Sequence, residues 1–250
     1  MTATPVVLLH GFPLDHRMWD DVAAQLGRDR TVLAPDLPGP ADALDAVGPT
    51  LDDAADRVAE AVRAAGVERA VVAGLSMGGY VALALLERHP ELVAGLALVD
   101  TRSTADAPEA RAKRLDVAAR VEESGTVDAV RGMVDTVLGE TTRTAHPEVV
   151  QRVAAWIDEQ PPARVAWSQR AMAARTDRTE VLRRFTGPVV VVVGDEDEVT
   201  RVDAAEDLAK VAGGAPLVVV PRAGHLTAVE DPAAVATALV ELAQRVDAGR

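Results

Sequence analysis

A serine lies where a buried strand must turn sharply into a helix, in the stretch Gly74-Leu75-Ser76-Met77-Gly78. Glycines two residues before and two residues after Ser76 leave room for a turn in which larger side chains would clash. A further glycine, Gly79, lets the following helix pack closely against the sheet. This pattern is the sequence form of a nucleophile elbow, and it predicts that the Ser76 hydroxyl is exposed at the end of its strand.

A serine hydroxyl is a weak nucleophile near neutral pH, so it needs a histidine base nearby. Among the five histidines, His225 is the best candidate because it follows Gly224 in the loop after the last predicted strand. The other histidines are His10, His16, His89 and His146. His10 closes the first strand and is expected to hold its loop, whereas the other three are expected on helices or their flanks. No two histidines have the spacing of metal ligands, so we predict no metal site.

The histidine needs an acidic partner that fixes its tautomer and stabilises its charged form. The loop after the strand Val189–Val193 offers four acids, Asp195, Glu196, Asp197 and Glu198. We favour Asp197, because it gives the chain order Ser, Asp, His with the acid on the strand before that of the histidine. Asp100 stays an alternative, since it ends the strand Gly95–Val99 at the same edge of the sheet.

Acyl transfer also needs two N–H donors for the oxyanion that forms on the substrate. The amide of Met77 is one candidate, because it follows the nucleophile at the start of a helix. The second is the amide of Phe12 in His10-Gly11-Phe12-Pro13, the loop after the first strand. The ring of Phe12 is then expected to border the acyl pocket.

Short runs rich in valine and leucine recur along the chain and are typical of strands buried on both faces. They are Val6–Leu9, Val32–Ala34, Ala70–Ala73, Gly95–Val99, Val189–Val193 and Leu217–Val220. Helical patterns alternate with most of them, at Arg17–Leu26, Leu51–Ala65, Met77–Arg88, Val202–Val211 and Pro232–Val246. The fold class is therefore α/β, with a doubly wound, mostly parallel sheet of about six strands and the site beyond their carboxyl ends.

The alternation stops between Thr101 and Gly187, where helical periodicity continues without a strand pattern. We predict a core formed by residues 1–100 and 188–250 and a helical cap, or lid, formed by residues 101–187. Large apolar residues of this segment include Met133, Trp156, Trp167, Met172 and Phe185. Each one taken singly fits internal packing of the cap, but together they are candidates for an apolar substrate wall. We take Met133, Trp156, Trp167 and Met172 as the candidate substrate contacts, together with Phe12.

Composition excludes several classes of partner. The chain of 250 residues carries a formal net charge of −13, with 39 acidic and 26 basic residues, and no basic run interleaved with aromatics. Nucleic acid and anionic membranes are therefore not expected partners. Cysteine is absent, which rules out thiol catalysis and disulfides. We expect a cytoplasmic protein without a cofactor; the sequence carries no pattern that indicates an oligomeric state.

With these residues assembled, the chain resembles the α/β-hydrolase superfamily over nearly its whole length. The matching stretches are His10 to Pro13 with Trp19, Pro35 to Gly39, Gly74 to Gly79, Gly194 to Thr200 and Gly224-His225. Within the superfamily it is most similar to the small esterases, enol-lactonases and cofactor-free perhydrolases. Two departures stand out: the early hairpin of the family is missing, and Pro40-Ala41-Asp42 replaces the usual continuation after Gly39.

The resemblance implies a serine hydrolase that acts on small, largely apolar esters or lactones through an acyl-enzyme. Ser76 would attack the carbonyl, His225 would transfer the proton, and Asp197 would orient His225. Carbon–carbon bond hydrolysis and peracid formation by the same triad are alternatives that depend on the shape of the pocket. A ligand-binding protein that only retains the fold is a more distant alternative.

Overall fold

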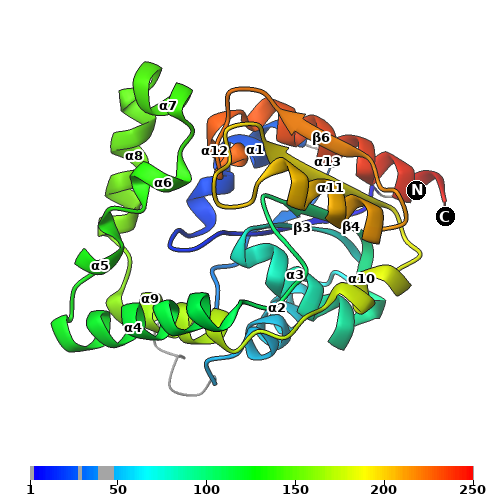
Figure 1. The fold of residues 1–250 in the computed structure, drawn as a ribbon. Helices are drawn as coiled ribbons and strands as arrows, with labels where there is room; N and C mark the ends of the chain where they lie inside the picture. The colour runs from blue at the N-terminus through cyan, green and yellow to red at the C-terminus, as the bar shows by residue number, and fades with distance from the viewer. Residues whose placement is uncertain (1–2, 28–29, 39–47, 250) are drawn as a thin grey trace.

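The computed structural model describes residues 3–27, 30–38 and 48–249 and contains a six-stranded, fully parallel sheet (Figure 1). The strand order is β2-β1-β3-β4-β5-β6. The strands are β1 (Val6–Leu9), β2 (Val32–Leu33), β3 (Ala70–Leu75), β4 (Val93–Val99), β5 (Val189–Gly194) and β6 (Leu217–Val220). Both the fold class and the location of each strand follow the prediction, within two residues at each end.

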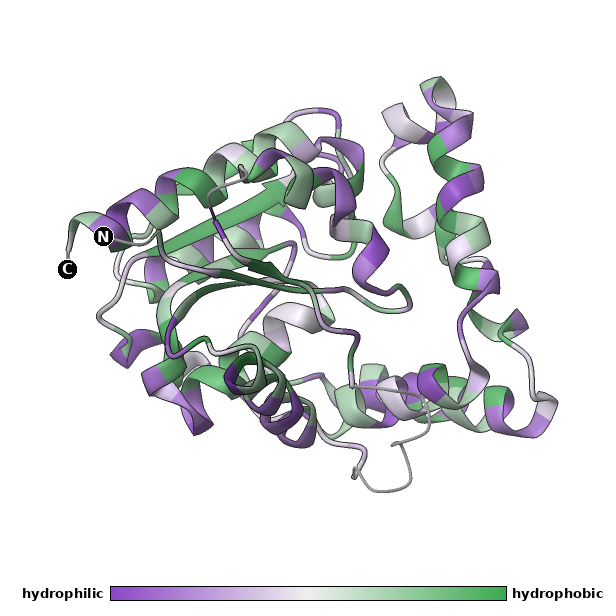
Figure 2. Cartoon of the chain, turned by 180° about the vertical axis from the view of Figure 1, so that it is seen from behind, coloured by the Kyte–Doolittle hydropathy of each residue, from purple (hydrophilic) through white to green (hydrophobic). Residues whose placement is uncertain are grey.

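The central strands form the hydrophobic core. Every residue of β1, β3, β4 and β5 is buried, because helices cover both faces of the sheet. Figure 2 shows these strands as the most hydrophobic part of the chain. The outer strands are less well covered, and Val219 of β6 is 43% exposed. This gradient explains why a continuous apolar run marks the central strands most clearly.

Helices flank the sheet in two layers. On one face α1 (Asp20–Gln25) packs against α13 (Pro232–Ala248), which also contacts β3, β4 and β5. On the other face α3 (Met77–Arg88) lies against β1, β3 and β4 and packs on α2 (Leu51–Ala64). Helix α11 (Val202–Val211) covers β5 and β6. Figure 1 shows the sheet between these layers.

Between β4 and β5 the described chain forms only helices. They are α4 (Pro108–Ser124), α5 (Asp128–Arg131), α6 (Val134–Val137), α7 (Glu140–Ala145), α8 (Pro147–Asp158), α9 (Pro162–Ala173) and α10 (Thr179–Arg184). Helices α4 and α9 pack along each other, and α8 packs against α5, α6 and α7. In Figure 1 helices α4 to α9 stand beside the edge where the strands end, on the side away from both termini. We use "helical segment" below for residues 101–187.

The chain after the first strand differs from the predicted single helix Arg17–Leu26. A 3₁₀ helix, η1 (His16–Trp19), precedes α1 instead. The Asp15 side chain begins this tight turn by accepting a hydrogen bond from the Arg17 amide at 3.1 Å. The tighter winding places both Met18 and Trp19 in the core, and neither is more than 2% exposed. A helical hydrophobic pattern does not distinguish these two windings.

The two expected departures from the family pattern lie after Gly39 and before the first strand. The predicted departure at Pro40-Ala41-Asp42 lies outside the described residues. Among the described residues, β1 is the first strand of the sheet. Within the described ranges, no helix is both long enough and apolar enough to cross a membrane.

Candidate active site

Ser76 occupies a strained turn between β3 and α3. Its backbone has φ 51° and ψ −110°, a conformation that residues with a Cβ rarely adopt. A Cβ at Gly74 would overlap the backbone of Gly78, and a Cβ at Gly78 would overlap the Leu9 carbonyl of β1. The two glycines are therefore required by close backbone approach, as the sequence pattern predicts. The turn leaves Ser76 partly exposed although all its neighbours in the turn are buried.

The structure brings the three predicted catalytic residues together from the ends of three strands. The Ser76 Oγ lies 2.8 Å from His225 Nε2, and His225 Nδ1 lies 2.8 Å from Asp197 Oδ2. The His225 side chain is 4% exposed and the Asp197 side chain is fully buried. Such a chain of hydrogen bonds lets a histidine accept the serine proton while the carboxylate stabilises the resulting imidazolium.

The second oxygen of Asp197 is held by its own loop. Oδ1 accepts hydrogen bonds from the amides of Val199 at 2.7 Å and Thr200 at 2.8 Å. These bonds fix the carboxylate and leave Oδ2 for His225. The neighbouring acids of the loop have other partners: Asp195 accepts from the Arg222 amide, and Glu196 binds Thr141.

Asp100, the alternative acid, is buried in the same region but has different partners. Its oxygens accept from the amide of Gly194 at 3.2 Å and from the amide and hydroxyl of Thr227 at 3.1 and 2.6 Å. Burial raises the pKa of the Asp100 carboxyl well above its usual range, and the nearby charge of Asp197 raises it further. Within the described chain, its hydrogen bonds tie the end of β5 to the residues after His225 and do not reach the imidazole.

The two predicted oxyanion donors line one small pocket. Met77 is the first residue of α3, where a helix has no internal acceptor for its amide. Neither the Met77 nor the Phe12 amide has a hydrogen-bond partner among the described residues. Both residues border a pocket with His10, Pro13, Leu14 and Leu37 on the core side. Four residues of the helical segment also line it: Gln160, Arg164, Val165 and Ser168.

The other predicted substrate contacts lie elsewhere in the helical segment. Met172 and Trp167 are buried in α9, and the Met172 sulfur is 3.3 Å from Arg114 Nη1. Met133 is half-buried at the start of α6. The half-buried Trp156 ring packs against the guanidinium groups of Arg17 and Arg152. These four residues do not border the pocket that Phe12 and Met77 share.

His10 holds the loop that carries Phe12, as expected from its place beside Gly11. Its Nε2 accepts a hydrogen bond from the Leu37 amide at 2.7 Å, which joins the loops after β1 and β2. Burial lowers the pKa of His10 and favours the neutral ring that can accept this bond.

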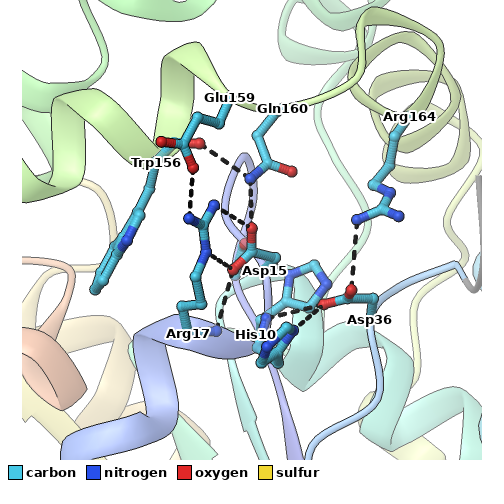
Figure 3. Close-up of polar contacts among 10 residues, drawn as sticks. His10, Asp15, Arg17, Asp36, Trp156, Glu159, Gln160 and Arg164 are labelled. Carbon is cyan, nitrogen blue, oxygen red and sulfur yellow. Dashed lines mark hydrogen bonds and ion pairs between the residues drawn. The ribbon is translucent and has the colours of Figure 1, made fainter.

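A set of polar contacts joins the loop after β1 to the helical segment (Figure 3). Arg17 pairs with both oxygens of Asp15, at 2.9 and 2.8 Å, and with Glu159 at 2.5 Å. Gln160 donates to Asp15 at 2.8 Å. Burial alone raises the pKa of Asp15, but the hydrogen bonds from Arg17 and Gln160 outweigh it and hold that pKa below its usual range.

Asp15 also belongs to the one group of described residues with metal-ligand spacing. Oxygen and nitrogen atoms of Asp15, His16 and Asp36 lie within 4.8 Å of one another. However, Asp15 is already paired with Arg17, and Asp36 accepts from both the amide and the ring of His16. Those hydrogen bonds account for the cluster, so we assign no metal to it.

Glu230 is a residue of the site that the sequence analysis missed. Its Oε1 accepts from the amides on either side of His225, those of Gly224 at 2.9 Å and Leu226 at 3.2 Å. Its Oε2 accepts from the Gly139 amide at 2.9 Å and the Thr142 hydroxyl at 2.6 Å. One carboxylate therefore joins the histidine loop to the α6–α7 junction, where the Val137 carbonyl also accepts from the His225 amide.

We expect Glu230→Ala to lower kcat for ester hydrolysis by about 10–100-fold, with a smaller change in KM. The substitution leaves two amides beside His225 without their acceptor, so the imidazole loses its fixed position relative to Ser76. Steady-state kinetics and thermal unfolding of the variant measure both effects. Glu241→Ala, on the exposed side of α13, is the matched control. Equal kcat values for the two variants would show that Glu230 does not position the base.

The fold is that of a known protein family. The sequence profile of the α/β hydrolase fold family matches residues 4–232, and the chain belongs to this family. The sheet of parallel strands, the serine turn after β3 and the histidine after β6 occur in the order that the resemblance implies. The predicted family and fold are confirmed.

Several relatives of this chain are esterases. The chain is 30% identical over 239 residues to a pimeloyl-(acyl-carrier protein) methyl ester esterase of Neisseria meningitidis serogroup C, covering 88% of this chain and 86% of that protein. It is 28% identical to a 2-succinyl-6-hydroxy-2,4-cyclohexadiene-1-carboxylate synthase of an Enterobacter species, covering 95% and 90%. Among solved structures, a thermophilic esterase from Thermogutta terrifontis with malate bound superposes with a TM-score of 0.89 at 35% identity, covering 98% and 91%. The predicted class of enzyme, an ester hydrolase, is confirmed by the esterases among these relatives.

Proposed function

We propose that this protein hydrolyses small carboxylic esters through an acyl-enzyme on Ser76. The observation that carries the proposal is the continuous set of hydrogen bonds from Asp197 through His225 to Ser76, each 2.8 Å long. Esterases of known name among the relatives support the ester bond as the bond that is cleaved.

In the first half of the reaction, Ser76 Oγ attacks the ester carbonyl as its proton moves to His225 Nε2. Negative charge develops on the carbonyl oxygen, where the amides of Met77 and Phe12 act as the two donors. The tetrahedral intermediate collapses when the protonated His225 gives its proton to the departing alcohol. Asp197 keeps the imidazole in the required tautomer and stabilises its positive charge throughout.

In the second half, His225 takes a proton from a water molecule that attacks the acyl carbonyl. The same two amides hold the second oxyanion. When it collapses, the bond between Ser76 Oγ and the acyl carbon breaks, His225 returns its proton to Oγ, and the acid is released. In both half-reactions, protons and electron pairs move only between Ser76, His225, the substrate and water.

We further propose that residues 101–187 act as a cap that covers the substrate over a core of residues 1–100 and 188–250. Two contacts support this division. Helix α9 forms one wall of the pocket beside the oxyanion donors, and the α6–α7 junction is hydrogen-bonded to the loop that carries His225. The cap therefore contributes to both the binding of the acyl group and the position of the base.

A fluorophosphonate probe tests the nucleophile directly. We expect one equivalent of probe to label the protein at Ser76, identified by mass spectrometry of the modified peptide. Short p-nitrophenyl esters are expected to be hydrolysed and to protect against labelling. Absence of label at Ser76 together with absence of ester turnover would overturn the proposed function.

A further inference from the structure

Two polar side chains of α9 border the pocket that Phe12 and Met77 share. Arg164 and Ser168 are four residues apart, so they lie on the same face of the helix. The Ser168 residue is 2% exposed and the Arg164 side chain is 13% exposed. The part of this pocket lined by α9 therefore includes one cationic and one hydroxyl side chain besides Val165, whereas the sequence led us to expect an apolar wall.

These two side chains have unused hydrogen-bonding capacity. The buried Arg164 Nε has no hydrogen-bond partner in the described part of the chain. No hydrogen bond of the Ser168 hydroxyl is found among the described residues. Gln160, the other polar residue of this wall, differs because its amide nitrogen donates to Asp15 at 2.8 Å and to the Trp156 carbonyl at 3.0 Å. Only Arg164 and Ser168 offer donors to a ligand among the cap residues of this pocket.

The single ion pair of Arg164 does not account for its burial. Arg164 Nη1 is 3.8 Å from Asp36 Oδ2, beyond hydrogen-bond distance (Figure 3). The other oxygen of Asp36 accepts closer bonds from the amide of His16 at 3.0 Å and from its ring at 2.8 Å. A buried guanidinium nitrogen without an acceptor is unfavourable, and an anion that binds to Arg164 Nε removes this cost.

From this arrangement we propose that the acyl pocket recognises an anionic group, with Arg164 and Ser168 as the residues that bind a carboxylate on the acyl side of the ester. The preferred substrates are then monoesters of short dicarboxylic acids. This inference rests on the proposed function, since it takes Phe12 and Met77 as the donors to the scissile carbonyl. A neutral acyl chain would leave the Arg164 and Ser168 donors unpaired, which selects against it.

Methanol release from paired methyl esters tests the preference. Monomethyl malonate, succinate and glutarate carry a free carboxylate, and the dimethyl esters of the same acids are neutral and nearly equal in size. For at least one acid, we expect the wild-type protein to have a kcat/KM at least tenfold higher for the monoester. Arg164→Gln is expected to reduce this ratio by about 10–100-fold, because the monoester loses its charged donor and the diester does not.

Three further variants separate the contributions of charge, of the Ser168 hydroxyl and of position on the helix. Arg164→Lys keeps the charge and is expected to retain part of the preference, and Ser168→Ala is expected to reduce it by less than Arg164→Gln does. Arg170→Gln lies on the same helix, but Arg170 pairs with Glu122 at 2.8 Å away from the pocket, so we expect no change in the ratio. Thermal unfolding checks that each variant is folded.

The inference and the proposed function fail in different ways. Hydrolysis of the diesters without a preference for any monoester, or an equal loss on both esters in Arg164→Gln, overturns the inference alone. Absence of all ester turnover, together with absence of fluorophosphonate label at Ser76, overturns the proposed function. In that case, calorimetric binding of monomethyl succinate to Ser76→Ala still decides the inference: binding that weakens at least tenfold in Ser76→Ala/Arg164→Gln supports it, and no binding, or equal binding to both variants, overturns it.

Discussion

Ser76→Ala is expected to lower kcat for ester hydrolysis by about 10⁶-fold and to abolish labelling by the fluorophosphonate. Removal of the hydroxyl leaves His225 without a nucleophile to activate, although its hydrogen bond to Asp197 remains. The residual rate over water comes from the Met77 and Phe12 amides and from substrate binding, which the substitution does not touch. Loss of the hydroxyl therefore removes the covalent route and not the pocket.

The fold is expected to survive this substitution. Alanine keeps the Cβ of serine, so the strained backbone at φ 51° is unchanged, and the hydroxyl has no partner other than His225 in the described chain. Thermal unfolding and kinetics on a chromogenic ester measure the two properties together. Ser124→Ala, at the exposed end of α4, is the matched control and should retain full activity. A Ser76→Ala variant that keeps more than about one-hundredth of the wild-type kcat would exclude Ser76 as the nucleophile.

The parts of the site that the sequence predicts are those that depend on local backbone geometry. The turn at Ser76 requires glycines because Gly74 and Gly78 contact other backbone atoms, and this requirement is visible as spacing. The loop residues Asp197 and His225 follow strands that are apolar throughout, so their edge of the sheet can be deduced. Parallel topology then brings them together without any information about side-chain packing.

The parts that the sequence does not predict depend on contacts between distant segments. Glu230 reads as an ordinary helix-end acid, and only the fold brings it to Gly139 and to the amides beside His225. Arg164 and Ser168 have the spacing of one helical face, but the sequence does not show which face of α9 borders the pocket. The tryptophans and methionines of the segment were predicted from residue type, whereas the α9 residues that line the pocket beside Phe12 are Arg164, Val165 and Ser168.

Substitution of the two buried acids tests which one supports the base. We expect Asp197→Asn to lower kcat by about 10⁴-fold, because an amide in this place no longer holds His225 in the tautomer that accepts the Ser76 proton. Asp100→Asn is expected to lower kcat less than tenfold. The Asp100 oxygens bind Gly194 and Thr227, so its contribution to the base is indirect.

We expect Asp100→Asn to lower the unfolding free energy even though its kcat changes little. The raised pKa of Asp100 favours a neutral carboxyl, which an amide resembles in shape, but the amide nitrogen can replace only one oxygen. If it replaces Oδ1, it faces the Gly194 N–H and that hydrogen bond is lost, at a cost of about 1–3 kcal/mol of unfolding free energy. Chemical denaturation together with kinetics of both variants separates the two roles. A loss of about 10⁴-fold in Asp100→Asn with near-normal activity in Asp197→Asn would instead make Asp100 the acid of the triad.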